Sequence, residues 1–353
     1  MRVLLALSLL APAPAADWRP SLRLDHGRFV LRELEATGPK DAWAFGTTPQ
    51  GIPAARRWNG RTWKKAVLPG AVFGSITSVD SSSPRNVWAF GGDAMRFDGH
   101  RWKIVKRFGK ATGMSSRVFG PKNVWVVLAG DRGRDRLAHY DGRRWKTVRT
   151  GLDGVRIGGT SSTDLWAIGD AGAKPVLRHR TSKGWSTVRP GAMPRQIPRK
   201  EVAGSVSQDV RLTGLTVVSR KNVWVTGEIW RDVVSGDPVS DPTDEILPFA
   251  LHWNGRRWSR VTLPETRNGE AGPLAPDGRG GYWWSSSDDA YDVYGPGRAR
   301  LFHWTGKDGW RERPAPGGQM ILAFERIPGT RGLWAQGLSY VTAAQTIFRS
   351  GAQ

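Results

Sequence analysis

SITSVDSSSPRNVWAFGGDAMRFDGHRWKIVK, residues 75–106, contains the repeat that decides the fold. Four strand-length segments are separated by short turns; they cover residues 75–82, 86–91, 94–97 and 101–106. The Asp98-Gly99 step between the third and fourth segments predicts a tight hairpin, because glycine accepts a positive φ angle. Asn86, two residues before Trp88, marks the turn between the first two segments. The stretch therefore predicts one four-stranded structural unit.

Two tryptophan motifs from this stretch recur along the chain. The first, (Asp/Asn)-x-Trp-(Ala/Val) followed by Gly, has five clear and two looser copies, at Trp43, Trp88, Trp125, Trp166, Trp224, Trp283 and Trp334. The second, aromatic-(Asp/Asn)-Gly-x-x-Trp, has four clear and two degenerate copies, which end at Trp63, Trp102, Trp145, Trp258, Trp185 and Trp310. Successive first-motif tryptophans are 45, 37, 41, 58, 59 and 51 residues apart. A four-stranded repeat of about 40–50 residues is typical of propeller blades. The sequence thus predicts an all-β, seven-bladed β-propeller.

The last blade lacks a second-motif tryptophan. Only 19 residues follow Trp334, and none of them is a tryptophan. Elsewhere the gap from a second-motif tryptophan to the next first-motif tryptophan is 21–25 residues, and once 39. Trp18 precedes Trp43 by 25 residues. We therefore expect an N-terminal strand at Trp18 to complete the last blade and to cover the two sheet edges that an open ring exposes.

Residues 1–16, MRVLLALSLLAPAPAA, have the pattern of a secretory signal peptide. An early charge at Arg2 is followed by an apolar run and by small residues that end at Ala16. We expect cleavage before Asp17, a single propeller domain over residues 17–353, and a secreted, extracellular protein. No later apolar stretch approaches the roughly 18 residues of a membrane span. The chain has no cysteine, which excludes disulfides, thiolate metal ligands and thiol catalysis.

The (D/N)VWAxG and HW(D/N)GxxW repeats resemble those of secreted, tryptophan-rich bacterial propellers, broadly akin to the Asp-box and kelch groups. The resemblance covers nearly all of residues 17–353 and implies the fold, but no single function, since propellers perform many functions. The motif departs from a true Asp-box, because the step is Asp-Gly-x-x-Trp and no hydroxyl residue stands two positions before the Asp. Seven blades argue against a sialidase, and the lack of cysteine argues against a copper-radical oxidase.

Four of the six histidines occupy one repeat position, about two residues before the turn between the third and fourth strands. They are His139, His179, His252 and His303. If they were catalytic, each would need its own active site, so we interpret them as structural. The sequence contains no HExxH motif, Ser-His-Asp order or glycine-rich phosphate loop that would indicate a common catalytic site.

The net charge of +22 has a defined distribution, because many basic residues flank the second-motif tryptophans on the outermost strands and their turns. These residues are Arg61, Lys64, Lys65, Arg101, Lys103, Lys106, Arg107, Arg143, Arg144, Lys146, Arg149, Arg256, Arg257 and Arg260. Charged edge strands keep sheets from pairing edge to edge. Attraction to acidic cell-wall or surface polymers is the functional alternative. Because we expect export, we expect no nucleic-acid partner.

Three insertions interrupt the repeat around blades 5 and 6. Two lengthen the connection between the second and third strands of these blades, and the third lies between Trp185 and Trp224. Such connections leave the same face of a propeller. Residues 228–245 and 285–297 carry nine carboxylates against one cation, Arg231; the nine are Glu228, Asp232, Asp237, Asp241, Asp244, Glu245, Asp288, Asp289 and Asp292. We expect an acidic patch on this face.

Aromatic residues outside the repeat positions gather in the same region. They are Trp230, Trp284, Tyr282, Tyr291, Tyr294 and Tyr340. Exposed rings beside carboxylates suit sugars, whose apolar faces stack and whose hydroxyls donate to carboxylates; they also suit a cationic peptide. We predict that Trp230, Asp232, Asp288, Asp289, Tyr291, Asp292, Tyr294 and Tyr340 bind the ligand. Asp288, Asp289 and Asp292 also form a candidate Ca²⁺ site, and we expect no other metal or cofactor. The alternative is a solvated acidic loop without a ligand.

Taken together, these patterns favour a monomeric, non-enzymatic binding propeller without catalytic residues, with a glycan or cell-envelope polymer as partner. One alternative is a glycoside hydrolase or polysaccharide lyase that uses Asp288, Asp289 and Asp292, which needs carboxylates about 5–10 Å apart in a cleft. The other is a protein–protein interaction scaffold that uses the basic rim.

Overall fold

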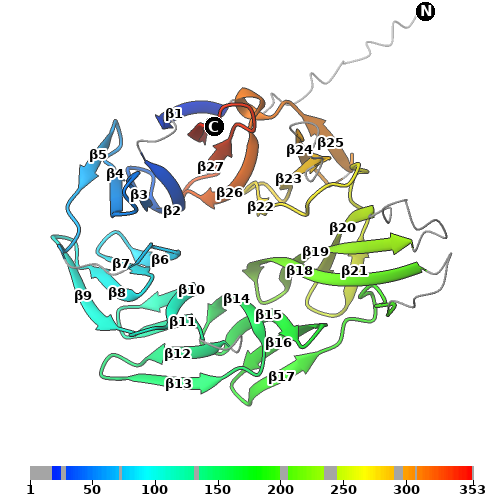
Figure 1. Cartoon of the computed structure of the whole chain (residues 1–353), viewed down its shortest axis with the longest axis horizontal. Helices are drawn as coiled ribbons and strands as arrows, with labels where there is room; N and C mark the ends of the chain where they lie inside the picture. Colours follow the sequence, from blue (N-terminus) through cyan, green and yellow to red (C-terminus); the bar gives the residue numbers. More distant parts are fainter. Residues whose placement is uncertain are drawn as a thin grey trace, which may run out of the picture.

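The computed structural model describes residues 18–24, 29–70, 74–130, 135–198, 206–233, 245–289, 297–306 and 308–351. The predicted signal peptide, residues 1–16, lies outside these residues. The described strands form seven four-stranded antiparallel sheets in a ring around a central channel (Figure 1). The prediction of an all-β, seven-bladed propeller is confirmed. No helix in the described part of the chain is long and apolar enough to span a membrane.

Each blade is a sheet whose strands succeed one another from the channel outward. Blade 1 contains β2 (Val30–Gly38), β3 (Asp41–Thr47), β4 (Pro53–Trp58) and β5 (Trp63–Ala66). Blade 2 contains β6 (Ser78–Ser83), β7 (Asn86–Phe90), β8 (Asp93–Phe97) and β9 (Trp102–Arg107). Blade 3 contains β10 (Thr112–Gly120), β11 (Asn123–Ala129), β12 (Arg136–Tyr140) and β13 (Trp145–Arg149). Blade 4 contains β14 (Asp153–Ser161), β15 (Asp164–Ala171), β16 (Lys174–Thr181) and β17 (Gly184–Val188).

The last three blades carry the irregularities. Blade 5 contains β18 (Val206–Ser219), β19 (Asn222–Val233), β20 (Glu245–Trp253) and β21 (Trp258–Val261). Blade 6 contains β22 (Leu274–Pro276), β23 (Tyr282–Asp288), β24 (Arg298–Trp304) and β25 (Trp310–Arg313). Blade 7 contains β26 (Met320–Arg326), β27 (Leu333–Leu338), β28 (Gln345–Ser350) and, as its outermost strand, β1 (Trp18–Leu24). A 3₁₀ turn, η1 (Pro316–Gly318), precedes β26.

The ring closes as predicted. Strand β1 pairs antiparallel with β28, from Trp18 opposite Ser350 to Leu24 opposite Gln345. The ring of Trp18 lies edge-on to Trp283 of blade 6, with centroids 5.8 Å apart. Trp18 thus occupies the position of the missing second-motif tryptophan, on a strand that comes from the opposite end of the chain.

The two tryptophan motifs meet between neighbouring blades. The first-motif Trp43 lies edge-on to the second-motif Trp102 of the next blade at 5.1 Å. The same contact recurs around the ring in the pairs Trp88–Trp145 (6.1 Å), Trp166–Trp258 (5.7 Å), Trp334–Trp63 (5.5 Å) and Trp283–Trp18 (5.8 Å). Burying a tryptophan removes roughly 150–250 Å² from water. The motifs therefore recur once in every blade because each blade must fill the same space against its neighbour.

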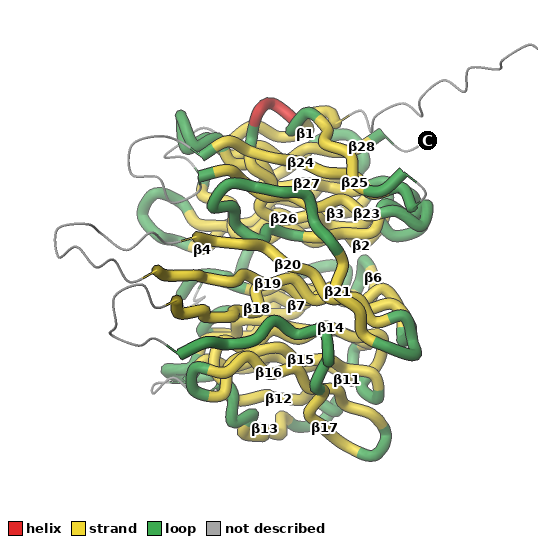
Figure 2. Tube along the Cα trace, turned by 90° about the vertical axis from the view of Figure 1, so that its right-hand side faces the viewer, coloured by secondary structure: helices red, strands yellow, loops and turns green. Residues whose placement is uncertain are grey.

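Connections between strands alternate between two faces of the ring, since successive strands are antiparallel. We call the face with the short first-to-second and third-to-fourth strand turns the turn face, and the opposite face the loop face. In the side view of Figure 2 the long ends of β18 and β19 project to the left, on the loop face. Residues 234–244, in the blade 5 insertion, and residues 290–296, in blade 6, lie outside the described residues.

Candidate functional site

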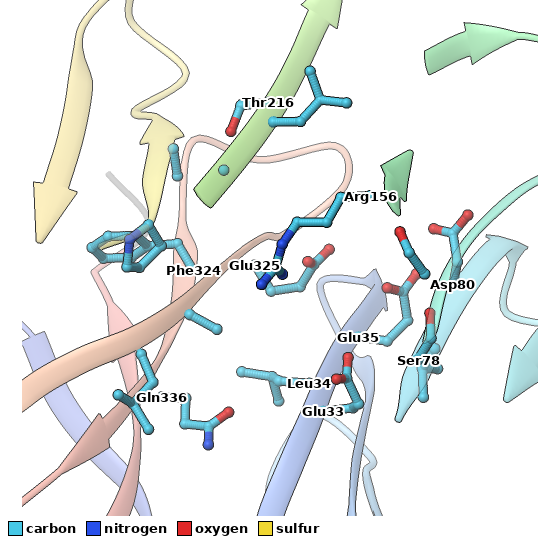
Figure 3. Close-up of a pocket in the computed structure, with 18 of the residues that line it drawn as sticks. Glu33, Leu34, Glu35, Ser78, Asp80, Arg156, Thr216, Phe324, Glu325 and Gln336 are labelled. Atoms are coloured by element: carbon cyan, nitrogen blue, oxygen red, sulfur yellow. The ribbon is translucent and has the colours of Figure 1, made fainter. Parts of the chain in front are cut away.

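A channel of about 1360 Å³ follows the axis of the ring and is lined mainly by the innermost strand of every blade. Acidic side chains from three blades project into it: Glu33 and Glu35 on β2, Asp80 on β6 and Glu325 on β26 (Figure 3). Blades 1, 2 and 7 are neighbours only because the ring is closed. The channel therefore brings together residues from both ends of the sequence.

Burial changes the protonation of these carboxyl groups. Burial raises the pKa of Glu33 to about 8, and the nearby charge of Arg156 opposes the rise. Burial and, as the second largest cause, the charge of Asp80 raise the pKa of Glu325 to about 8. An ionised carboxylate is costly where water is excluded. The raised pKa values favour the protonated form of both side chains, which can donate as well as accept a hydrogen bond.

Glu35 and Asp80 are held by specific partners. Glu35 is 6% exposed, and its Oε1 accepts a hydrogen bond from Ser81 Oγ at 2.5 Å. Burial and the neighbouring Glu325 and Asp80 raise the pKa of Glu35. Asp80 accepts a hydrogen bond from the backbone N–H of Val118, and Arg117 Nη1 lies 3.7 Å from its Oδ1. Burial also raises the pKa of Asp80, against the effect of Arg117.

The rest of the channel wall is a mixture of hydroxyl groups and apolar side chains. The hydroxyls of Ser78 and Ser116 are 2.8 Å apart across blades 2 and 3, and Thr216 Oγ1 donates to Leu274 O at 2.8 Å. Met114 on β10 is 48% exposed and Leu322 on β26 is 37% exposed, although both belong to innermost strands. Strands that surround a channel can leave such side chains uncovered.

The channel carboxyl groups do not resemble a metal centre. Among the described residues, no group of three or more His, Asp or Glu side chains is arranged to hold a metal ion. The wall can instead offer hydrogen bonds and apolar contact to an organic ligand.

Two predicted ligand residues, Trp230 and Asp232, line a second groove of about 610 Å³ on blade 5. The guanidinium group of Arg211 lies 4.6 Å from the centre of the Trp230 ring. Trp230 Nε1 donates to Glu228 Oε2 at 3.0 Å, and Glu228 Oε1 accepts from the backbone N–H of Ala271 at 2.9 Å. Glu228 also lines the channel. One buried carboxylate thus connects the groove to the channel wall.

Asp288 and Asp289, at the end of β23, are each engaged by arginine. Asp288 Oδ2 lies 2.6 Å from Arg300 Nη1, and its Oδ1 accepts from the backbone N–H of Arg267 at 3.0 Å. Asp289 forms an ion pair with the guanidinium group of Arg267. Neither residue lines the groove of Trp230. Asp292, Tyr291 and Tyr294 lie outside the described residues, so the calcium site stays a prediction.

Tyr340 follows β27 on the loop face, between Leu338 and Ala343, which line the channel. It is 36% exposed, and its hydroxyl group donates to Met320 Sδ. Burial and, as the second largest cause, the charge of Glu270 raise the pKa of Tyr340. Glu270, Leu338 and Ala343 line the channel, so Tyr340 lies next to channel-lining residues on the loop face without lining the channel itself.

Two aromatic residues expected on the surface are buried. Trp284 is 0% exposed within the core between blades 5 and 6, and Tyr282 is 6% exposed. Tyr282 packs on Trp224 of blade 5 at 4.6 Å, and its hydroxyl oxygen accepts from Asn222 Nδ2 at 2.6 Å. The expectation of exposed rings at these positions was wrong, because both side chains fill the interface between blades.

The interpretation of the repeated histidines as structural is confirmed. Each stacks on the first-motif tryptophan of its own blade, with ring centroids 3.8–4.4 Å apart; the pairs are His139–Trp125, His179–Trp166, His252–Trp224 and His303–Trp283. Arginines take this place in blades 1, 2 and 7, where Arg57, Arg96 and Arg349 lie over Trp43, Trp88 and Trp334. A contact that recurs in every blade belongs to the fold.

The channel carboxyl groups were not among the residues that the sequence pattern singled out. The innermost strands carry no tryptophan motif, so their residues attract no attention in a search for repeats. The available signal was the presence of charged residues in a first strand, such as Glu33 and Glu35 on either side of Leu34.

No protein-family model matches the sequence, and no curated protein is similar to it. The structure of YCF48 bound to a D1 peptide is similar over 97% of this chain and 99% of that one, with a TM-score of 0.60 and 11% identity. A chain of the mitotic checkpoint complex has a TM-score of 0.52 and 14% identity, over 99% and 98% of the two chains. The WD40 β-propeller domain of Doa1 has a TM-score of 0.51 and 10% identity, over 94% and 97%. At these identities the similarity shows the propeller fold alone.

Proposed function

We propose that this protein is an exported, non-enzymatic binding propeller that takes a carbohydrate segment of a glycan or cell-envelope polymer into its central channel. The ligand enters from the loop face, past Tyr340 and Glu270. Export rests on the signal-peptide pattern of residues 1–16.

One observation carries the proposal: the channel wall combines carboxyl groups, whose pKa is raised by burial, with hydroxyl groups and uncovered apolar side chains. Sugars present the complementary set, since every hydroxyl group both donates and accepts and the ring carbons form apolar faces. A protonated Glu33 or Glu325 can match either role of a sugar hydroxyl group. Glu325, Glu35 and Asp80 each accept a hydrogen bond from the first strand of the next blade, at Ala36, Ser81 and Val118. Perturbed titratable groups in a cavity are typical of functional sites.

The test compares two substitutions that introduce the same side chain, one in the channel wall and one on the outer rim of a blade. Met114→Trp narrows the channel at an exposed position of β10, and Val148→Trp adds the same bulk at an exposed position of the outermost strand β13. Glycan-array and cell-envelope binding should be lost in the Met114→Trp variant and kept in the Val148→Trp variant. Unchanged binding in both variants would overturn the channel as the site.

Hydrolysis of a glycoside is a second candidate function, favoured by the raised pKa values of Glu33 and Glu325 beside other carboxyl groups. A glycosidase needs one carboxyl group that stays protonated and a second that is ionised. Release of reducing sugar from a bound glycan, abolished by Glu325→Gln, would replace the non-enzymatic proposal.

A peptide is the competing ligand class, because YCF48, which shares the fold, was solved with a D1 peptide. A peptide array would identify it.

A further inference from the structure

Exposed cations surround the turn face. Fourteen lysine and arginine side chains on the described turns of this face are exposed; they are Lys40, Arg61, Arg85, Arg101, Lys122, Arg143, Arg144, Lys183, Arg220, Lys221, Arg256, Arg257, Arg279 and Arg331. All seven blades contribute at least one of them. The tryptophan motif associated the basic residues with the outermost strands and the turns that lead into them. Half of the present set instead belongs to the turns between the first and second strands.

A repeated packing contact holds several of these cations. In blade 1, the stem of Lys40 lies across the third-to-fourth strand turn at Gly60, whose φ angle is +96°. A Cβ atom at Gly60 would lie 3.1 Å from Lys40 Cβ. The contact recurs in three more blades, with Arg85 over Gly99, Lys122 over Gly142 and Lys221 over Gly255. A Cβ atom on these glycines would lie 2.9, 2.6 and 2.7 Å, respectively, from the nearest carbon of the basic side chain. The turn glycine thus serves two purposes: it accepts the positive φ angle and leaves room for the basic side chain of the neighbouring turn.

Little negative charge compensates these cations. None of Lys40, Arg85, Lys122 and Lys221 forms an ion pair with a described residue. Among the described turns of this face, Asp308 is the exposed acidic residue, whereas Asp277 is buried. The turn aspartates Asp98 and Asp141 use Oδ1 to accept backbone N–H groups, at 2.9–3.0 Å. Oδ2 of Asp98 lies 2.8 Å from Lys103 Nζ, and Oδ2 of Asp141 lies 3.6 Å from Lys146 Nζ and 3.9 Å from Arg144 Nε. The described acidic residues next to the insertions of blades 5 and 6, Asp232, Glu245 and Asp288, lie at the strand ends of the opposite face.

We propose that the turn face binds a linear, water-soluble polymer with a phosphate group in every repeat unit, of the kind a cell envelope carries. Ten of the fourteen cations are arginines, and arginine pairs with phosphate through two parallel hydrogen bonds. Each blade supplies a weak contact, and a polymer that reaches several blades sums them. None of the exposed large apolar side chains belongs to the described turns of this face, which favours a soluble polymer over a bilayer.

The probe for the test is long-chain inorganic polyphosphate, with binding to residues 17–353 measured at increasing salt. Binding should weaken steeply, and each phosphate-contacting cation contributes about 1 unit to the slope of log Kd against log salt. One variant combines Lys40→Gln, Lys122→Gln, Arg143→Gln, Arg256→Gln and Arg257→Gln on the turn face. The matched control makes the same charge change on the outermost strands, with Lys64→Gln, Lys65→Gln, Lys106→Gln, Arg149→Gln and Arg260→Gln.

The turn-face variant should lose most of the affinity and salt slope, while the control should keep them. Equal losses in both variants would show that net charge alone drives binding and would overturn the proposal, as would absence of polyphosphate binding at low salt. Tighter binding to anionic vesicles or to double-stranded DNA than to polyphosphate would overturn the choice of partner. The Met114→Trp variant should bind polyphosphate normally, so failure of the channel proposal is distinguishable from failure of this one.

Discussion

The side chain of Gln345 pairs with the backbone of Leu31, 314 residues away in the sequence. The N–H group of Leu31 donates to Gln345 Oε1 at 2.7 Å, and Gln345 Nε2 donates to Leu31 O at 3.0 Å. Gln336 Nε2, on the neighbouring strand β27, donates to the same carbonyl oxygen at 3.2 Å. These buried bonds join blade 7 to blade 1 near the loop face. The closed ring therefore has a polar connection in addition to the pairing of β1 with β28.

Replacing Gln345 should destabilise the closed ring. Gln345→Ala leaves the buried N–H group of Leu31 without a partner and removes one of two donors to its carbonyl oxygen. An unsatisfied buried polar group costs about 1–3 kcal/mol, so we expect the free energy of unfolding to fall by about 2–4 kcal/mol in urea titrations. Gln50→Ala, at an exposed turn, is the control and should stay within about 0.5 kcal/mol of wild type. Equal stability of the two variants would contradict a role for this contact.

Removing residues 17–24 should be more damaging than any single substitution. The deletion uncovers the edge of β28 and removes the Trp18 contact with Trp283, and an uncovered edge strand promotes aggregation. We expect a lower Tm and oligomers in size-exclusion chromatography. Removing residues 351–353 should change little, because β28 ends at Ser350. A deletion variant that stays monomeric and melts within a degree or two of wild type would show that β1 is dispensable.

Stability should fall as the pH rises from about 4.5 to about 8. Glu33 and Glu325 have an ordinary pKa of 4.5 when unfolded and a pKa of about 8 when folded. The unfolded state gains free energy by ionising above pH 4.5, while the folded state keeps its protons until about pH 8, so their contribution is complete at low pH and lost across this window. Urea unfolding at several pH values measures the decline. In the Glu33→Gln, Glu325→Gln double variant the free energy of unfolding should fall less steeply with pH. A fall of the same steepness in that variant would show that other groups cause the pH dependence.

The groove on blade 5 should contribute to ligand binding without supporting the fold. We expect the Trp230→Ala variant to bind the channel ligand about 10-fold more weakly, which corresponds to about 1.4 kcal/mol. Its Tm should stay close to that of wild type. Trp284→Ala is the matched control: Trp284 is fully buried, so its loss should lower the Tm strongly. Unchanged affinity in the Trp230→Ala variant would confine the site to the channel.

The repeat predicted the fold because its tryptophans meet at equivalent positions of neighbouring blades. Trp43 against Trp102 and Trp88 against Trp145 are copies of one contact, so a motif that recurs once per blade reports a constant packing requirement. The spacing of the motifs assigned Trp18 to the last blade. The histidines could be interpreted as structural for the same reason, because a residue type that recurs at one position of several blades contributes to the packing of each of them.

The candidate site could not be predicted in this way. Glu35, Asp80 and Glu325 each lie opposite the first-motif tryptophan of their blade, but no motif surrounds this position and the other four blades carry non-acidic residues there. The three acids become neighbours because innermost strands converge on the axis of a ring that is closed by its own two ends. Their raised pKa values are a property of that convergence, because burial and mutual repulsion arise only after the blades have assembled. The contact of Lys40 with Gly60 likewise depends on two turns that meet only when the blade has folded. Sequence periodicity determined which residues pack between blades, whereas the closure of the ring decided which charged residues share the channel and which surround the turn face.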